Sequence, residues 1–158
     1  MTPNLRRLML LICVIFAWTG AAEAAEHQTG AVDRNAPISF RTLDGDILQV
    51  DLDEIWRIRA AIGRDEPAGS TVIDYAFERL FVGDPLETVV EEIRLRRDLR
   101  QFTLPSGAPI YIFPEKIIGI KRSIPNQHHP NSRSILIARE GEQQVQESRQ
   151  AIRDSLGK

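Results

Sequence analysis

Few residues of this chain combine the type and spacing that chemistry requires. The chain has three histidines and one cysteine. His128 and His129 are adjacent in a turn-rich stretch, and neighbouring histidines rarely bind one metal ion without a further ligand. Ser132 and Ser134 lack a motif that would activate a serine nucleophile. The stretch is therefore interpreted as a solvated loop tip, with a small metal-binding or hydrolytic site as the alternative.

A second candidate metal site depends on where the chain is processed. If the mature chain begins at Ala25, His27 becomes its third residue. The terminal amine, two backbone nitrogens and the imidazole nitrogen then form a square-planar set that suits copper(II) or nickel(II). Copper or nickel at His27 is thus one cofactor option. The sequence indicates no other cofactor and no catalytic residue.

Residues 1–24 have the pattern of a secretory signal peptide. Two arginines precede an apolar run from Leu8 to Trp18, and Ala22 and Ala24 occupy the two small-residue positions before the predicted cut. As a helix this run rises about 16 Å, roughly half of a bilayer's hydrocarbon thickness, which disfavours a membrane anchor. Cleavage would also remove Cys13, the only cysteine, so the exported chain must be stabilised by packing without disulfides.

The charge balance restricts the classes of partner. The net charge of the chain is -2, and removal of two arginines and one glutamate with the signal makes the remainder slightly more acidic. An acidic chain lacks the electrostatic attraction that nucleic-acid binding requires. We therefore expect a periplasmic or secreted protein with no nucleic-acid partner and no transmembrane segment after cleavage.

The exported part has the pattern of an α+β fold rich in antiparallel strands. Residues 25–37 contain few large apolar side chains and are expected to form a flexible leader. Residues 38–99 are expected to form a β-rich unit closed by a helix. Residues 100–158 are expected to form a second β-rich unit with a C-terminal helix.

Alternating apolar residues predict the strands of the first unit. A hairpin is expected around the Asp44-Gly45 turn, followed by strands at 55–58 and 71–77. The last strand is expected to place Phe77 on one face with Ile73.

A helix is expected from Pro85 to about Leu99. Asp84 has the side chain of a helix cap, Pro85 suits the first helical position, and Glu87 can complete a capping box.

The second unit repeats the spacing of the first. Alignment of Gly107 on Gly45 matches apolar positions without a gap through Ile124, and Ser148 is expected to cap a closing helix that ends at Gly157. A tandem duplication would explain the match, and two units could then pack about a pseudo-two-fold axis. Chance similarity between two hairpins is the alternative.

The stretch from Pro109 to Pro114 is apolar at consecutive positions, so both faces of its strand are apolar. Such a strand is either buried on both sides, which we favour, or presents one face to a partner. The candidate interaction residues are Trp56, Tyr111, Phe113, His128 and His129.

The second unit also contains a pattern of strands and turns found in a known family. Ser106-Gly107 lies in a hairpin, Ile117 and Ile120 close a strand, Ser134 to Ile137 forms the next strand, and Val145, Glu147 and Ser148 lead into a helix. On these residues, 102–156 resembles the small flagellar FlbD-type β-domains. The resemblance implies a small β-rich fold and carries over no functional residue. This chain departs from the family in its signal peptide, its extra length and its histidine-containing loop.

These observations predict an exported, non-catalytic β-rich module that binds a protein or an envelope component through a sheet face or edge. Self-association is a further option for its partner. The alternative is a small periplasmic metal-binding protein or hydrolase that uses His27, His128 or His129.

Overall fold

The computed structural model describes residues 36–157. The predicted signal peptide, Cys13, His27 and nearly all of the predicted leader lie outside these residues. Within the described residues, the N-terminal half (38–99) contains β1 (Ile38–Arg41), β2 (Ile47–Val50), the 3-10 turn η1 (Leu52–Glu54), β3 (Ile55–Ala60), β4 (Thr71–Tyr75), β5 (Glu78–Val82) and α1 (Leu86–Arg94). The C-terminal half (100–157) contains β6 (Arg100–Thr103), β7 (Pro109–Ile112), η2 (Pro114–Lys116), β8 (Gly119–Arg122), β9 (Ser134–Ile137), β10 (Glu142–Val145) and α2 (Arg149–Leu156).

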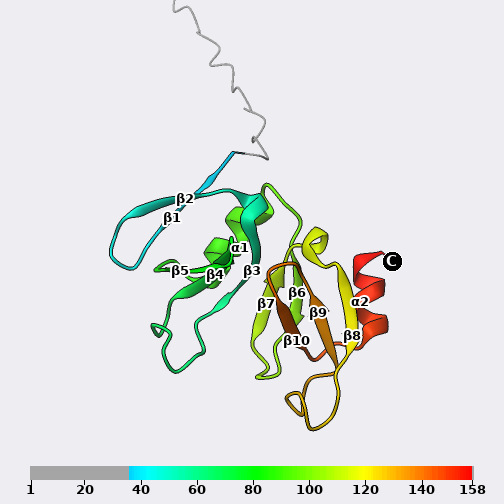
Figure 1. Cartoon of the computed structure of the whole chain (residues 1–158). Helices are drawn as coiled ribbons and strands as arrows, with labels where there is room; N and C mark the ends of the chain where they lie inside the picture. The colour runs from blue at the N-terminus through cyan, green and yellow to red at the C-terminus, as the bar shows by residue number, and fades with distance from the viewer. Residues whose placement is uncertain (1–35, 158) are drawn as a thin grey trace, which may run out of the picture. The chain divides into compact units, whose positions relative to one another are not determined.

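All strand pairs are antiparallel, which confirms the predicted α+β fold rich in antiparallel strands. The central sheet has the strand order β5-β4-β3-β7-β6, and two smaller sheets have the orders β1-β2 and β10-β9-β8 (Figure 1). The pairing of β3 with β7 makes one sheet from strands of both halves. The halves are therefore joined through backbone pairing as well as through side chains.

The two halves have the same order of elements and corresponding strand registers. Ile38 pairs with Val50 in the first hairpin, and Arg100 pairs with Ile112 in the second. Each hairpin also accepts one backbone hydrogen bond from the segment after the half's last strand. The Gly83 amide donates to Arg41 at 3.2 Å, and the Gln146 amide donates to Thr103 at 2.9 Å.

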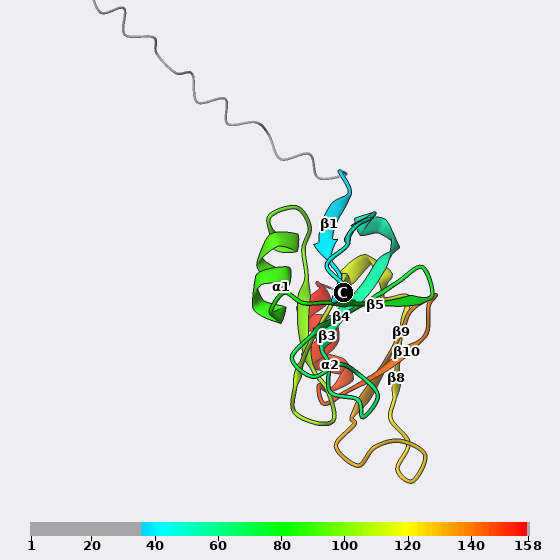
Figure 2. The ribbon, with the colours of Figure 1, turned by 90° about the vertical axis from the view of Figure 1, so that its left-hand side faces the viewer.

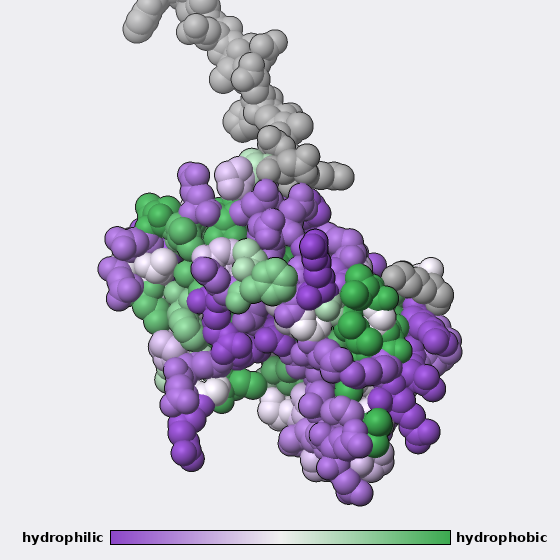
Figure 3. Space-filling model, in the orientation of Figure 1, coloured by the Kyte–Doolittle hydropathy of each residue, from purple (hydrophilic) through white to green (hydrophobic). Residues whose placement is uncertain are grey.

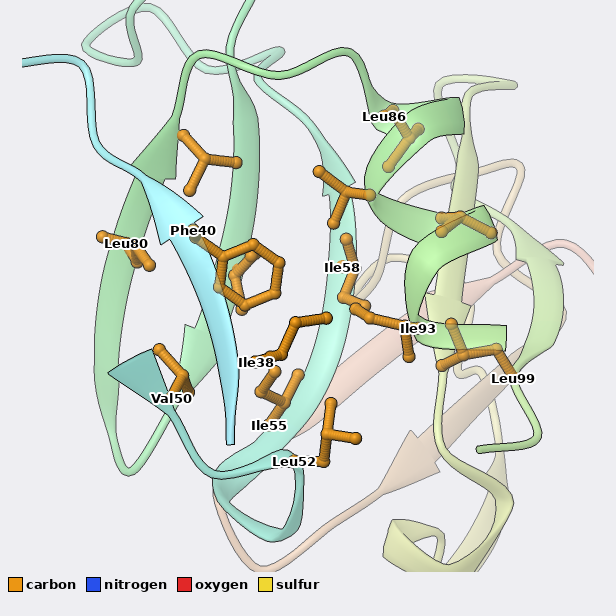
Figure 4. Close-up of a cluster of buried hydrophobic side chains, with 14 of the residues drawn as sticks. Ile38, Phe40, Val50, Leu52, Ile55, Ile58, Leu80, Leu86, Ile93 and Leu99 are labelled. Atoms are coloured by element: carbon orange, nitrogen blue, oxygen red, sulfur yellow. The ribbon is translucent and has the colours of Figure 1, made fainter. Parts of the chain in front are cut away.

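Two apolar cores lie on either side of the strands shared by the halves. In the first, side chains of the β1-β2 hairpin, β3 and α1 converge, including Phe40, Ile58 and Ile93 (Figure 4). The second contains Phe102 and Ile152 and lies between the C-terminal strands and α2. Figure 2 shows α1 and the β8–β10 sheet on opposite sides of β3.

The apolar stretch around β7 is buried on both faces. Ile110 and Ile112 belong to the second core, whereas Phe113 belongs to the first and Tyr111 packs against it. This arrangement supports burial between the halves over presentation of one face to a partner.

The first helix differs from its prediction at both ends. It ends at Arg94, and Leu99 is buried in the first core because the chain turns back toward β6. Pro85 is the N-terminal boundary residue and no side chain caps the helix, so the expected cap from Asp84 is wrong. In α2, Ser148 accepts from the Ala151 amide and Gly157 ends the helix, as predicted.

Two further expectations about the strands are wrong. Phe77 does not extend β4, because the chain reverses at Ala76 and Phe77 into β5, a strand that the sequence pattern did not reveal. The halves are also not packed about a two-fold axis: β3 of one half pairs with β7 of the other, and no reciprocal pairing of β2 with β8 occurs in residues 36–157. Over the same residues, neither helix has the length and apolar character needed to span a bilayer.

Candidate functional site

A cleft of about 470 Å³ lies between the tips of the β4-β5 and β9-β10 hairpins. The two 3-10 turns, η1 and η2, supply the rest of its lining. The residues of this hairpin cleft are Asp53, Glu54, Ala76, Phe77, Glu115, Lys116, Ile118, Arg139 and Glu140. Corresponding elements of both halves therefore build one concave surface.

Phe77 is the most unusual residue of the hairpin cleft. Tyr75 pairs with Glu78, so Ala76 and Phe77 form a two-residue loop, and their φ angles are 43° and 67°. Positive φ at both positions is typical of a type I′ turn, which asparagine and glycine normally occupy because a side chain there costs about 1 kcal/mol or more. Phe77 is also 75% exposed. A strained backbone that holds a large apolar side chain in solvent indicates a functional constraint.

The loop is fixed to the body of the protein by its backbone. The Ala76 amide donates to the Glu54 carbonyl at 3.0 Å, which attaches the tip of the hairpin to η1. Phe77 therefore has a defined position at the rim of the hairpin cleft.

Glu140 provides a hydrogen-bond acceptor in the same place. Its side chain is only 9% exposed, and one carboxylate oxygen lies 3.5 Å from Lys116 Nζ. The other oxygen, Oε2, is buried and has no hydrogen-bond partner within the described part of the chain. Glu140 also lines a second hollow, of about 360 Å³, together with Phe77 and Trp56. Buried acceptors are normally satisfied by protein groups or ordered water, and Ser134 Oγ and Glu147 Oε2 share this state within the described residues, so what sets Glu140 apart is its place in the lining of the hairpin cleft.

The floor of the hairpin cleft is held by ion pairs between the halves. The Arg97 guanidinium contacts Asp53 of η1 and Glu115 of η2, with 3.1 Å to Glu115 Oε1. The hydrogen bond to Asp53, followed by the contacts to Glu115, raises the pKa of Arg97. Lys116 also donates from Nζ to the Asp53 carbonyl. These contacts keep the two 3-10 turns at a fixed separation.

Arg57 supports the second hollow and links the halves. Its guanidinium donates to Asp74 at 2.6 Å and to Gln143 of β10 at 2.5 Å, and it lies 4.3 Å from the centre of the Trp56 ring. Burial lowers the pKa of Arg57 despite the neighbouring Asp74 carboxylate. Arg57 thus connects the lining of the second hollow to β4, through Asp74, and to β10, through Gln143.

Glu66 organises the loop between β3 and β4. It accepts two hydrogen bonds from Arg59, at 2.5 and 2.7 Å, and one each from the Ile62 and Gly63 amides at 2.9 Å. The hydrogen bonds from Arg59 are the main cause that lowers the pKa of Glu66 from 4.5 to about 2, with the amides contributing. The Glu66 carboxylate thus accepts hydrogen bonds from a side chain of β3 and from the backbone of the loop.

The rings of His128 and His129 form hydrogen bonds with nearby backbone amides. His128 Nδ1 lies 2.8 Å from the Ile124 amide nitrogen, and the Asn131 amide donates to His129 Nδ1 at 3.2 Å. Both rings therefore contact the backbone of their own loop. No group of three or more histidine, cysteine or acidic residues in positions 36–157 is arranged to hold a metal ion.

The other predicted interaction residues are largely buried. Phe113 is fully buried, Trp56 is 4% exposed, and Tyr111 is half-buried with the Arg94 guanidinium 5.3 Å from its ring centre. None of these three lines the hairpin cleft, although Trp56 lines the hollow beside it. Their burial explains their large apolar side chains without a partner.

Sequence reasoning missed Phe77 and Glu140, the two residues that distinguish the site. Neither glycine nor asparagine marks the Ala76-Phe77 loop, so the alternation of apolar residues continues through it. The only local signal is the charged pair Glu78-Arg79, which interrupts the apolar pattern directly afterwards. Glu140 lies between β9 and β10, and its contact with Lys116 joins positions that are far apart in the sequence.

Comparison with known proteins identifies no relative: no family model matches the chain, and no curated protein or solved structure is detectably similar to it.

Proposed function

We propose that this chain is an exported, non-catalytic module that binds a protein segment in the hairpin cleft. The observation that carries the proposal is the strained turn that holds Phe77 in solvent beside the buried Glu140 carboxylate. Aromatic side chains, including phenylalanine, are enriched in protein–protein interfaces relative to the rest of the surface. Export follows from the signal-like sequence of residues 1–24 and is part of the same proposal.

The lining indicates the chemistry of the bound segment. Phe77 and the 69% exposed Ile118 would contact an apolar side chain. The Glu140 carboxylate, which lines the hairpin cleft, would accept a hydrogen bond from a backbone amide or a basic side chain of the partner. The mixture of acidic residues with Lys116 and Arg139 disfavours a uniformly charged ligand.

We also propose that the two halves arose by tandem duplication. The corresponding registers of the β1-β2 and β6-β7 hairpins support this, as does the identical placement of η1 and η2 between strands. On this proposal, the Ala76-Phe77 loop corresponds to the turn at Arg139 and Glu140. The FlbD-type resemblance of the C-terminal half would then describe the ancestral unit.

Site-specific photocrosslinking tests the binding proposal. A photoreactive phenylalanine analogue at position 77 of the exported chain should give discrete adducts with one partner in the envelope. The matched control places the same analogue at Glu87, which is exposed on α1 away from the hairpin cleft. Equal labelling from both positions, or no adduct from position 77, would contradict the proposal.

The identified partner then allows a quantitative measurement. Phe77→Ala and Glu140→Leu should each weaken its binding by about tenfold or more, because the first removes the aromatic contact and the second removes the hydrogen-bond acceptor. Thermal unfolding of both variants shows whether the fold is retained. Unchanged affinity in folded variants would remove the hairpin cleft as the binding site.

A further inference from the structure

The pairing of β3 with β7 joins the two halves, and the equivalent strands β8 of the C-terminal half and β2 of the N-terminal half lack the corresponding pairing within the described residues. Within residues 36–157, β2 pairs only with β1, and β8 pairs only with β9. Backbone groups along such an edge are available to another strand. The edge of β2 belongs to the N-terminal half and the edge of β8 to the C-terminal half.

β2 corresponds to β7, and β8 corresponds to β3, and β3 and β7 already pair with each other inside the chain. The β1-β2 hairpin has the register of the β6-β7 hairpin, whose second strand adds to β3. β8 has the place of β3, since each follows a 3-10 turn and pairs with the next strand. The chain therefore contains one completed junction and the two components of a second.

Burial differs between the completed and the incomplete junction. Trp56, at the β3 position that meets β7, is 4% exposed, whereas Ile118, at the corresponding position before β8, is 69% exposed. A small hollow of about 150 Å³ next to β8 is lined by Ile118, Ile120 and Arg153, among others. On the opposite edge Ile47 of β2 is also 69% exposed. Figure 3 shows apolar side chains over the β1-β2 hairpin and beside β8 and α2.

The two edges also have opposite charge. β8 carries the exposed residues Lys121, which pairs with Glu142 of β10 at 2.5 Å, and Arg122, and the β1-β2 turn carries the exposed residues Asp44 and Asp46. Basic residues on an edge strand discourage indiscriminate pairing, while an acidic hairpin complements them. The charge pattern thus favours the chain's own hairpin as the occupant of the β8 edge.

We propose that a second copy of this chain adds its β2 strand to β8, so that copies join head to tail. The register follows the internal pairs Arg57–Ile112 and Ile58–Tyr111. It places Val50 of one copy opposite Gly119 of the next, Gln49 opposite Ile120, and Ile47 opposite Arg122. The contact uses different surfaces on the two copies, so it generates a ring or a growing chain and not a two-fold dimer.

Single cysteines at the paired positions test this register. Two variants of the full chain, both carrying Cys13→Ser, receive Ile47→Cys or Arg122→Cys; both sites are exposed, so folding should be retained. The mixture should form a disulfide-linked dimer under mild oxidation, several-fold more than either variant alone. The matched control replaces Ile47→Cys with Glu87→Cys, on an exposed helix surface, and should give only background.

The unmodified protein provides the second measurement. Sedimentation velocity should show a mean mass that rises with protein concentration and falls with added salt, because opposite charges contribute to the contact. A monomer at every concentration together with background cross-linking would overturn the proposal, as would a dimer from Ile47→Cys alone. Phe77→Ala should leave the assembly unchanged, which separates this proposal from partner binding in the hairpin cleft.

Discussion

The two halves contain the same elements in the same order, yet they differ in the pairing of one strand and in the residue that holds the following loop. β3 is paired on both edges, whereas β8 is paired on one within the described residues. The loop after β3 is clamped by Glu66, which accepts from the Ile62 amide, and the loop after β8 places His128 Nδ1 next to the Ile124 amide. One architecture thus tolerates a carboxylate or an imidazole at the same loop position. We expect Glu66 to stabilise its loop more than His128 does, because Glu66 accepts hydrogen bonds from a charged guanidinium as well as from amides.

The effect of an alanine substitution on the free energy of unfolding should differ most between the corresponding positions Trp56 and Ile118. Trp56→Ala removes a buried side chain at the junction of the halves and should lower the free energy of unfolding by about 3–5 kcal/mol. Ile118→Ala removes an exposed side chain and should change it by about 0.5 kcal/mol or less. Urea unfolding of both variants under conditions that keep the protein monomeric measures the contrast, and equal losses would show that the positions do not differ in burial.

The two loop clamps provide the next contrast. Glu66→Gln should cost about 2 kcal/mol at neutral pH, because the Arg59 guanidinium loses its carboxylate partner and solvent screening reduces the full effect. His128→Gln, at a half-buried position of an otherwise exposed loop, should cost about 0.5 kcal/mol or less.

The acid dependence of stability follows from the lowered pKa of Glu66. Because its pKa falls from 4.5 to about 2 on folding, its contribution is complete above pH 4.5 and is lost as the pH falls toward 2. The difference between the wild type and Glu66→Gln should therefore shrink over this range when unfolding is followed by circular dichroism. A difference that stays constant down to pH 2 would exclude Glu66 as its source.

The hairpin tips differ in how their backbones tolerate side chains. The double substitution Ala76→Asn with Phe77→Gly suits the type I′ turn and should stabilise the fold by about 1 kcal/mol while it abolishes partner binding. In the other tip, Gly141 has a φ of 155°, so Gly141→Ala should destabilise by about 1–2 kcal/mol. Thermal unfolding measures both, and a loss of stability in the double variant would refute the strain at Phe77.

The smallest contrast lies at the starts of the helices. Ser148→Ala should cost about 1 kcal/mol because the hydroxyl accepts from the Ala151 amide at 3.2 Å. Asp84→Ala should have almost no effect, since its side chain does not cap α1 and only its carbonyl accepts from Thr71. Comparable losses in urea unfolding would mean that Asp84 caps the helix in solution.

Local patterns in the sequence predicted the elements better than their connections. The Asp44-Gly45 hairpin and the Ser148 cap follow from residues that are adjacent in the chain, and both were predicted correctly. The pairing of β3 with β7 and the end of α1 at Arg94 depend on contacts between distant segments, which alternation and capping rules do not contain.

The candidate site was harder to predict than the fold. Phe77 is distinguished by a backbone conformation that its neighbours in sequence do not encode, and Glu140 by a burial that needs the opposite half. The imidazole rings of His128 and His129 contact the backbone of their own loop, and the His129 amide donates to Gln144 of β10.

The fully buried Phe113 has a consequence for the order in which the chain acquires structure. It comes from the C-terminal half but belongs to the core of the N-terminal half. A chain that emerges from its N-terminus first cannot complete that core until residue 113 has appeared. Proteolysis of nascent chains stalled before and after this residue should therefore show protection of residues 38–99 only in the longer ones. Such a delay would make the folding of the N-terminal half depend on the C-terminal half, so that the two halves acquire structure together.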